Sequence, residues 1–185
     1  HRAQSRPRRS GRLDGLCLAL LPNHAHHLVR TGTRALPPRL RSLLTGYAGA
    51  FNRCHKRVGH LFQNRYKSIV VEEEPYLLEL VRYLHLNPLR AGIVPDLKAL
   101  DRYPYSGHAT LVGRRPRAWQ DAAEILGRFA APRGAARRKY RRFVAEGIRQ
   151  GRRADLAGGG SDRFIDAMVL WGTADQVKEK LRAHF

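Results

Sequence analysis

Cysteine, acidic residues and long apolar runs are all scarce in this 185-residue chain. Its two cysteines are too few for a disulfide framework or a cysteine-based zinc site, which predicts reduced thiols in a cytoplasmic compartment. The longest apolar run, residues 16–21, is far too short to cross a membrane and lacks the cleavage pattern of a signal peptide. No glycine-rich loop of the Walker type is present. These absences exclude a disulfide-stabilised extracellular domain, a membrane-spanning protein and a P-loop nucleotide hydrolase.

The shortage of acids leaves a large positive charge. The chain has 35 Lys and Arg against 15 Asp and Glu, a formal net charge of +20. Asp14 is the only acid among residues 1–71, and Glu146 is the only acid among residues 133–153. Such an excess attracts polyanions, with nucleic acid as the default partner and with salt-dependent binding through counterion release. On charge alone, a ribosomal-type or merely basic protein is an equal alternative.

Changes in composition divide the chain into four segments. Residues 1–13, rich in Arg, Ser and Pro, predict a disordered basic arm. Residues 14–113 are expected to form the core domain and residues 114–157 a basic helical extension. Residues 158–185 begin with three glycines and predict a linker with a short helical tail. The first residue is His rather than Met, which predicts a fragment or an imperfect reading frame.

Apolar periodicity predicts the first elements of the core domain. Residues 16–29 are interpreted as a buried strand with a bend or bulge at Pro22-Asn23. Leucine and aromatic residues at spacings of three and four predict a helix over residues 36–57, closed by Gly59.

A strand at residues 68–71 and a long helix are predicted next. The acids and the proline of residues 72–75 mark a helix start, and this helix is expected to run to about Leu86 and to stop before Pro88. Two more helices are expected near residues 117–130 and 134–150.

His24-Ala25-His26 is the first pattern that carries chemistry. On a strand, residues i and i+2 point to one face, so both imidazoles leave that face together and form part of a site for a divalent ion. Two ordinary histidines at a strand end are the simpler explanation of a bare His-x-His pattern. His27 alternates to the face of Ala25 and is expected not to join the pair.

Tyr83 and Asn87 form the second pattern. Four residues apart on a helix, they lie one above the other on its flank, where a phenol can reach a phosphate and an amide oxygen can complete a metal shell. The alternative is a tyrosine at the core edge and a helix-capping asparagine. Together with the histidines, the pattern predicts a metal that polarises a phosphate and a nucleophile that attacks it. Tyr66, in a segment interpreted as extended, is the competing nucleophile.

Residues 21–26, LPNHAH, resemble the Pro-Asn-His-x-His segment of the REP-associated tyrosine transposases, members of the single-tyrosine HUH transposase superfamily. The segments GHLFQNRYK at 59–67, YLHLNPLRAG at 83–92 and YPYSGH at 103–108 are also similar, so the resemblance covers about residues 16–113. It implies a ferredoxin-like α+β fold, an antiparallel sheet with helices packed on one face.

The resemblance also implies a site. His24 and His26 would bind Mg²⁺ or Mn²⁺ with Asn87 as the third protein ligand, and Tyr83 would attack a DNA phosphate to leave a 5′-phosphotyrosine. The implied protein is a nucleoid-associated transposase and endonuclease, a monomer or homodimer, that cleaves and rejoins single-stranded DNA near hairpins. The alternatives are a catalytically inactive DNA-binding remnant of such a transposase and a basic RNA-binding protein.

Basic side chains along the whole chain are candidates for holding the DNA backbone. They are Arg39, Arg41, Arg53, Lys56, Arg57, Arg65, Lys67, Arg137, Arg138 and Arg141. Phe62, Tyr66 and Tyr105 are candidates for stacking on an unpaired base. For each of these residues taken singly, a solvated charge or a core aromatic is the simpler explanation.

The chain departs from the family pattern at both ends. The family begins with a strand and a helix before the His-x-His strand, and residues 1–15 resemble neither, so the predicted sheet lacks its first strand and has an open edge. His27 stands where the family has an aliphatic residue. A stretch at residues 167–181 resembles the C-terminal part of luciferase-like monooxygenases, but without their barrel it could not bind a cofactor.

Overall fold

The computed structural model describes residues 14–22, 24–30, 36–62, 66–71, 73–150 and 165–171. Its elements in chain order are β1 (Asp14–Leu20), β2 (His24–Arg30), α1 (Leu36–Cys54), β3 (Lys67–Val71), α2 (Glu73–Arg90), α3 (Leu97–Leu100), α4 (His108–Leu111), α5 (Ala122–Leu126), α6 (Arg133–Glu146), the 3-10 helix η1 (Gly147–Gln150) and β4 (Ile165–Trp171). The α+β class predicted from the sequence is therefore confirmed. None of the helices in the described ranges has both the length and the apolar character needed to cross a bilayer.

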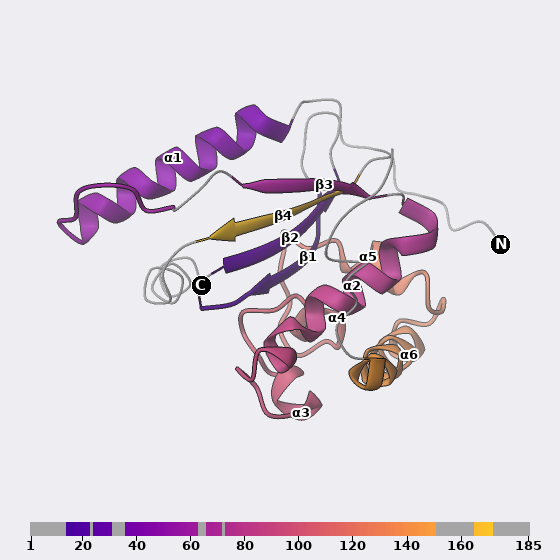
Figure 1. Cartoon of the computed structure of the whole chain (residues 1–185). Coiled ribbons are helices and arrows are strands. Elements are labelled where there is room, and N and C mark those ends of the chain that lie inside the picture. The colour runs from indigo at the N-terminus through magenta and orange to yellow at the C-terminus, as the bar shows by residue number, and fades with distance from the viewer. Residues whose placement is uncertain are drawn as a thin grey trace.

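The strands form one antiparallel sheet in the order β1-β2-β4-β3 (Figure 1). β1 and β2 are neighbours in a hairpin, with Leu20 opposite Ala25. The single strand predicted over residues 16–29 is therefore two strands, and Pro22 lies in the connection between them, while Asn23 lies outside the described residues. β1 has no alternating pattern in the sequence because it is buried on both faces.

The strand β4 lies between β2 and β3 and pairs with both. The prediction of a short helical tail is therefore wrong for residues 165–171. After Asp166 the sequence of β4 is a short apolar run, and periodicity alone cannot tell such a run from a buried helix. β4 supplies the sheet with a fourth strand, in place of the N-terminal strand that was predicted to be missing.

The outer edge of β1 is covered by later segments of the chain, although an open sheet edge was predicted. Three backbone hydrogen bonds cover it: Leu20 N to Tyr105 O at 2.9 Å, Gly107 N to Leu18 O at 2.7 Å and Asp121 N to Gly15 O at 2.8 Å. These bonds use the donors and acceptors with which an open edge would pair to another chain.

The helix α2 covers one face of the hairpin. Its Leu77, Val81 and Leu84 are buried in one cluster with Cys17 of β1 and Leu28 of β2. The apolar stripe predicted for this helix is therefore confirmed. The helix continues to Arg90 and contains Pro88, beyond the predicted end at Leu86. A proline so close to the end removes only one of the last hydrogen bonds of the helix.

The helix α1 lies on the other side of the sheet (Figure 1). Its Leu36 and Leu40 pack against Val29, which alternates with Leu28 along β2 and so points away from α2. The helices therefore occupy both faces, not one as predicted. The helix itself matches the prediction over residues 36–57 closely, but Leu43 of its predicted stripe is 59% exposed.

The C-terminal half of the chain is more helical than predicted in one place and less in another. Residues 88–113, predicted to be mostly loop, contain α3 and α4. The predicted helix near 117–130 is limited to the five residues of α5, whereas α6 and η1 fill the predicted 134–150 range.

Candidate functional site

His24 and His26 point from β2 to the face of the sheet that α2 covers. They share this face with Leu28, because residues i and i+2 of a strand point the same way. Their ring centroids lie 4.8 Å apart and the rings are nearly perpendicular, at 84°. His27 alternates to the opposite face. The fold therefore brings two half-buried imidazoles together and leaves the third apart.

Burial keeps both imidazoles of the pair neutral. It lowers the pKa of His26 to about 3, with smaller contributions from the neighbouring His24 and His27. It also lowers the pKa of His24. The neutral imidazole is the form that binds a metal ion, so these two side chains are held in the ligand state across the neutral pH range.

His85 shows how α2 is turned about its own axis. Its Nε2 lies 2.9 Å from Sγ of Cys17 on β1, and its Nδ1 lies 2.7 Å from the hydroxyl of Tyr140 on α6. Each residue of an α-helix advances by about 100°, so Tyr83 and Asn87 both lie about 160° from His85, in opposite senses. His85 contacts β1 and α6, so Tyr83 and Asn87 lie on the side of α2 opposite to the Cys17 contact.

Tyr83 and Asn87 are both half-buried on this flank. Tyr83 packs against the main core, and the guanidinium carbon of Arg90 lies 5.3 Å from its ring centroid. Nδ2 of Asn87 is buried and has no hydrogen-bond partner among the described residues. A buried amide donor without a partner is uncommon and indicates room for an acceptor, such as a phosphate oxygen. Arg90 was not predicted as a site residue, although its spacing of seven from Tyr83, two helical turns, indicates the same face.

The two histidines and Asn87 fit a divalent ion that accepts nitrogen and oxygen ligands. In the part of the chain that the structure describes, no cluster of three or more His, Cys, Asp or Glu side chains is placed to hold a metal. The predicted third ligand, Asn87, carries an amide, which is not among these side-chain types. The 4.8 Å between ring centroids suits a shared ion, because each centroid would lie about 3 Å from it.

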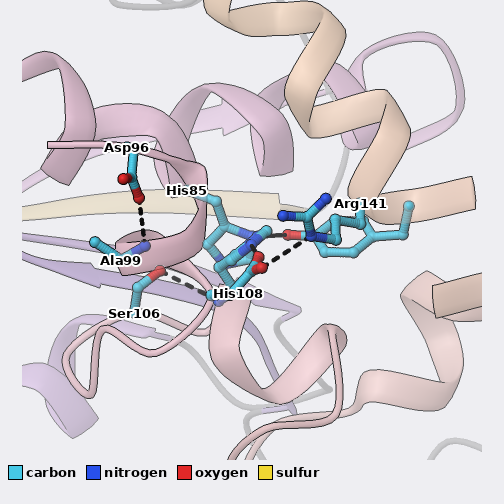
Figure 2. Close-up of polar contacts among 8 residues, drawn as sticks. His85, Asp96, Ala99, Ser106, His108 and Arg141 are labelled. Carbon is cyan, nitrogen blue, oxygen red and sulfur yellow. Dashed lines mark hydrogen bonds and ion pairs between the residues drawn. The ribbon is translucent and has the colours of Figure 1, made fainter. Parts of the chain in front are cut away.

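A buried chain of hydrogen bonds lies on the other side of α2. Figure 2 shows His85, His108 and Arg141, from three different helices, gathered at one place. The links run from Cys17 Sγ to His85 Nε2 (2.9 Å), from His85 Nδ1 to the Tyr140 hydroxyl (2.7 Å), on to His108 Nδ1 (2.8 Å), from His108 Nε2 to Asp101 Oδ1 (2.9 Å), and from Asp101 Oδ2 to Arg141 Nε (2.8 Å).

The Asp101 end of this network determines which group donates and which accepts in each of its hydrogen bonds. The carboxylate of Asp101 can only accept, so His108 donates through Nε2. Burial lowers the pKa of His108, so its ring is neutral and its Nδ1 accepts the Tyr140 hydroxyl proton. Tyr140 in turn accepts from Nδ1 of His85, whose Nε2 then accepts from the thiol of Cys17. Each of these hydrogen-bonding groups therefore has a partner within the network.

This network is structural and does not form a thiol active site. A cysteine beside a histidine is the arrangement of many thiol nucleophiles, but Cys17 is fully buried and burial raises its pKa well above the ordinary value. The thiol therefore stays protonated. This network was not predicted from the sequence, although His85 and His108 lie in two of the segments that carry the resemblance stated above.

The predicted DNA-binding residues form two groups on opposite sides of the sheet (Figure 1). Arg39, Arg41, Arg53, Lys56 and Arg57 lie on α1 or directly after it, and Arg137, Arg138 and Arg141 lie on α6. Arg65 lies outside the described residues, and Lys67 is the first residue of β3. The two groups are not brought together on one surface.

The predicted stacking aromatics all have packing partners. Tyr66 packs against Leu36 and Leu40, and Tyr105 packs against a small cluster formed by β1 and β2. The ring of Phe62 lies near Tyr47 of α1, with 6.4 Å between ring centroids. Trp119, which was not predicted, is the more exposed aromatic at 38%.

Comparisons with known proteins identify no relative of this chain. No protein-family model, no curated protein and no solved structure matches the chain.

Proposed function

We propose that this chain cleaves and rejoins single-stranded DNA beside a hairpin, with Tyr83 as the nucleophile and Mg²⁺ or Mn²⁺ held by His24, His26 and Asn87. The observation that carries the proposal is the position of the two imidazoles, 4.8 Å apart on the face covered by α2. Tyr83 and Asn87 lie on the side of that helix opposite to His85.

The proposed reaction exchanges one phosphate ester for another. The phenolic oxygen of Tyr83 attacks a DNA phosphorus, the bond from phosphorus to the 3′ oxygen breaks, and that oxygen leaves with a proton as a 3′-hydroxyl. Attack by a 3′-hydroxyl on the 5′-phosphotyrosine reverses the exchange and rejoins the strand. Because one ester replaces another, no ATP is needed.

The residues around Tyr83 would stabilise the charge of the reacting phosphate. The bound divalent ion would supply positive charge to the phosphate oxygens. Arg90 lies beside the ring of Tyr83 and would add a second positive charge where the phosphate must lie. The net charge of +20 supports DNA as the substrate and, through it, an association with the nucleoid.

The test is the covalent adduct itself. A labelled hairpin with single-stranded flanks, incubated with the protein and Mn²⁺, should give a protein–DNA band that survives denaturing electrophoresis. Tyr83→Phe should abolish this band, whereas Tyr66→Phe, which removes the competing nucleophile, should leave it unchanged. An adduct of parental intensity from Tyr83→Phe would contradict the proposal.

The second candidate is a DNA-binding protein without catalysis. It is favoured by one observation: in the described ranges no carboxylate or thiolate joins the histidine pair in a metal-binding cluster. Such a protein would bind the hairpin with equal affinity in Mn²⁺ and in EDTA, and it would form no adduct at any Mn²⁺ concentration.

A further inference from the structure

A cavity of about 1060 Å³ lies at the end of the hairpin opposite to the histidine pair. Asp14 opens β1 and Arg30 closes β2 at this end, and both line the cavity. Its volume is close to the upper limit of about 1,000 Å³ for small-molecule sites. His24 and Arg30 are six residues apart on β2, which separates the cavity from the histidine pair by about 20 Å.

Trp119 lines this cavity and is 38% exposed. The indole lies against the backbone of Gly15, where any added Cβ would come within 2.8 Å of its Cε3 atom. A glycine at this position is therefore needed for the ring to lie where it does. The guanidinium carbon of Arg117 lies 5.6 Å from the ring centroid. The aromatic face is thus held in place in the absence of any ligand.

Arg137 and Arg133 bring positive charge to the lining of the same cavity. The guanidinium of Arg137 lies on Gly113, where an added Cβ would meet its Cζ at 2.5 Å. Gly113 has a φ of +83°, a conformation that favours glycine. Nε of Arg137 is buried and has no hydrogen-bond partner within the described residues. A buried guanidinium nitrogen without a partner points to an anionic ligand.

The acids that line the cavity are largely occupied. Glu124 is bound by Arg30 and Arg128, at 3.0 Å in each case. The carboxylate of Asp121 accepts the backbone N–H of Glu124 and caps α5. These acids therefore do not compete for Arg133 and Arg137.

We infer that this cavity binds one unpaired nucleotide of a single-stranded DNA, with its base stacked on Trp119 and its phosphate held by Arg137 and Arg133. Stacking on an indole accepts any base, and a planar guanidinium fits the phosphate geometry. This nucleotide site rests on the proposed function and deepens it, because it adds a second contact of the same DNA substrate about 20 Å from the histidine pair, roughly the span of six nucleotides.

Fluorescence of Trp119 tests this inference directly. The chain has two tryptophans, so Trp171→Phe leaves Trp119 as the single reporter. Titration with a six-nucleotide oligothymidylate should quench its emission, whereas inorganic polyphosphate, which carries charge but no bases, should not. Equal quenching by both probes would overturn the inference. In the unsubstituted chain, a 5-iodouracil oligonucleotide should photo-crosslink to the peptide that contains Trp119, and crosslinking confined to other peptides would overturn it as well.

Binding affinities of variants add a quantitative test. Trp119→Ala should weaken oligonucleotide binding roughly 5- to 150-fold, the loss expected for one stacked base, and Trp119→Phe should keep most of the affinity. Arg137→Gln should weaken binding and reduce the salt dependence by about one counterion. Arg142→Gln is the matched control, because Arg142 lies on the same helix with its side chain 83% exposed and outside the cavity.

The outcomes separate this inference from the proposed function. If Trp119→Ala weakens DNA binding but the unsubstituted chain forms no Tyr83 adduct, the nucleotide cavity stands and the strand-cleavage proposal falls. If the adduct forms and depends on Tyr83, while Trp119→Ala binds DNA as tightly as its parent, the cavity inference falls and the proposed function stands.

Discussion

Sγ of Cys17 lies 2.9 Å from Nε2 of His85, although the two residues are 68 positions apart in the chain. The contact joins β1 to α2 in the centre of the core, where both side chains are fully buried. It fixes the rotation of α2 about its own axis, and with it the side of the helix on which Tyr83 lies. The proposed nucleophile is therefore oriented by a neutral histidine and a protonated thiol that take no part in the reaction.

Tyr140→Phe should destabilise the fold strongly for the loss of a single oxygen atom. The Tyr140 hydroxyl bridges Nδ1 of His85 and Nδ1 of His108, and its removal leaves one buried donor and one buried acceptor unsatisfied. The expected cost is about 2–4 kcal/mol in the free energy of unfolding. In a chain of this size that corresponds to a fall in Tm of roughly 4–16 °C, measurable by thermal denaturation.

Tyr105→Phe is the control for this substitution. Tyr105 is half-buried, and no hydrogen bond of its hydroxyl joins it to another residue in the described part of the chain. Its change in unfolding free energy should stay within about 0.5 kcal/mol. Equal effects of the two substitutions would show that the network does not hold the core.

Two glycine-to-alanine substitutions should change the free energy of unfolding in opposite directions. Gly147 has helical backbone angles, so alanine should be favoured there, yet an added Cβ would lie 2.6 Å from Cδ of Arg82. Arg82 cannot move freely, because it is bound to Gln150 at 2.7 Å and lies over the ring of Phe143 at 4.2 Å. Gly147→Ala should therefore cost about 1–3 kcal/mol in chemical denaturation.

Gly46→Ala should instead stabilise the chain. Gly46 lies within α1, and an added Cβ would meet nothing within 4 Å. The gain should be about 0.5–1 kcal/mol, the helix preference of alanine over glycine. Stabilisation by both substitutions would mean that Arg82 is not packed against Gly147 as described.

The elements that the sequence predicts well are those with a local, one-sided pattern. α1 and α2 have apolar residues at spacings of three and four, and the alternation of His24, Ala25 and His26 is local in the same way. β4 was missed because its short, mostly apolar sequence does not show whether it forms a helix or pairs with strands from distant parts of the chain. The division of the helices between two faces depends on which side of β2 each helix contacts, and no periodicity within a single helix contains that information.

The candidate site, too, is predictable from local spacing only in part. Strand alternation predicts that His24 and His26 share a face, and helical spacing predicts that Tyr83 and Asn87 share a flank. The orientation of that flank depends on His85, whose partners Cys17 and Tyr140 come from distant parts of the chain. The cavity beside Trp119 depends on the close approach of Trp119 to Gly15. A contact between two such distant segments cannot be predicted from the residue spacing within either one.

The stability of the fold should fall as the pH falls below about 6.5. Burial lowers the pKa of five histidines: His24, His26, His27, His85 and His108. Below pH 6.5 the unfolded chain takes up protons that the folded chain does not, so each such histidine removes at most about 1.4 kcal/mol per pH unit. Asp101 and Glu124, whose pKa values are also lowered, lose their contribution only at more acidic pH.

His27→Gln isolates one of these contributions. Burial lowers the pKa of His27 to about 4, so its stabilising effect is complete above pH 6.5 and is lost progressively down to about pH 4. The variant should lose less stability than the parent between pH 7.5 and pH 5.0 in urea denaturation, by at most about 2 kcal/mol. His60→Gln, at an exposed position, should keep the dependence of the parent. Identical pH profiles for His27→Gln and the parent would contradict the burial of that imidazole.

Mn²⁺ should stabilise the chain through the histidine pair, independently of any DNA. An ion that binds only the folded state stabilises it by about 2.7 kcal/mol at a concentration one hundred times its Kd, which raises Tm by roughly 5–11 °C. His26→Ala should remove this shift, because His26 points to the face covered by α2. His27→Ala should retain it, since His27 points to the opposite face of the same strand. Asn87→Ala should reduce the shift without removing it, as expected for an amide ligand that is weaker than an imidazole. A Tm increase of equal size in His26→Ala and the parent would place the metal elsewhere and would remove the main support for the proposed reaction.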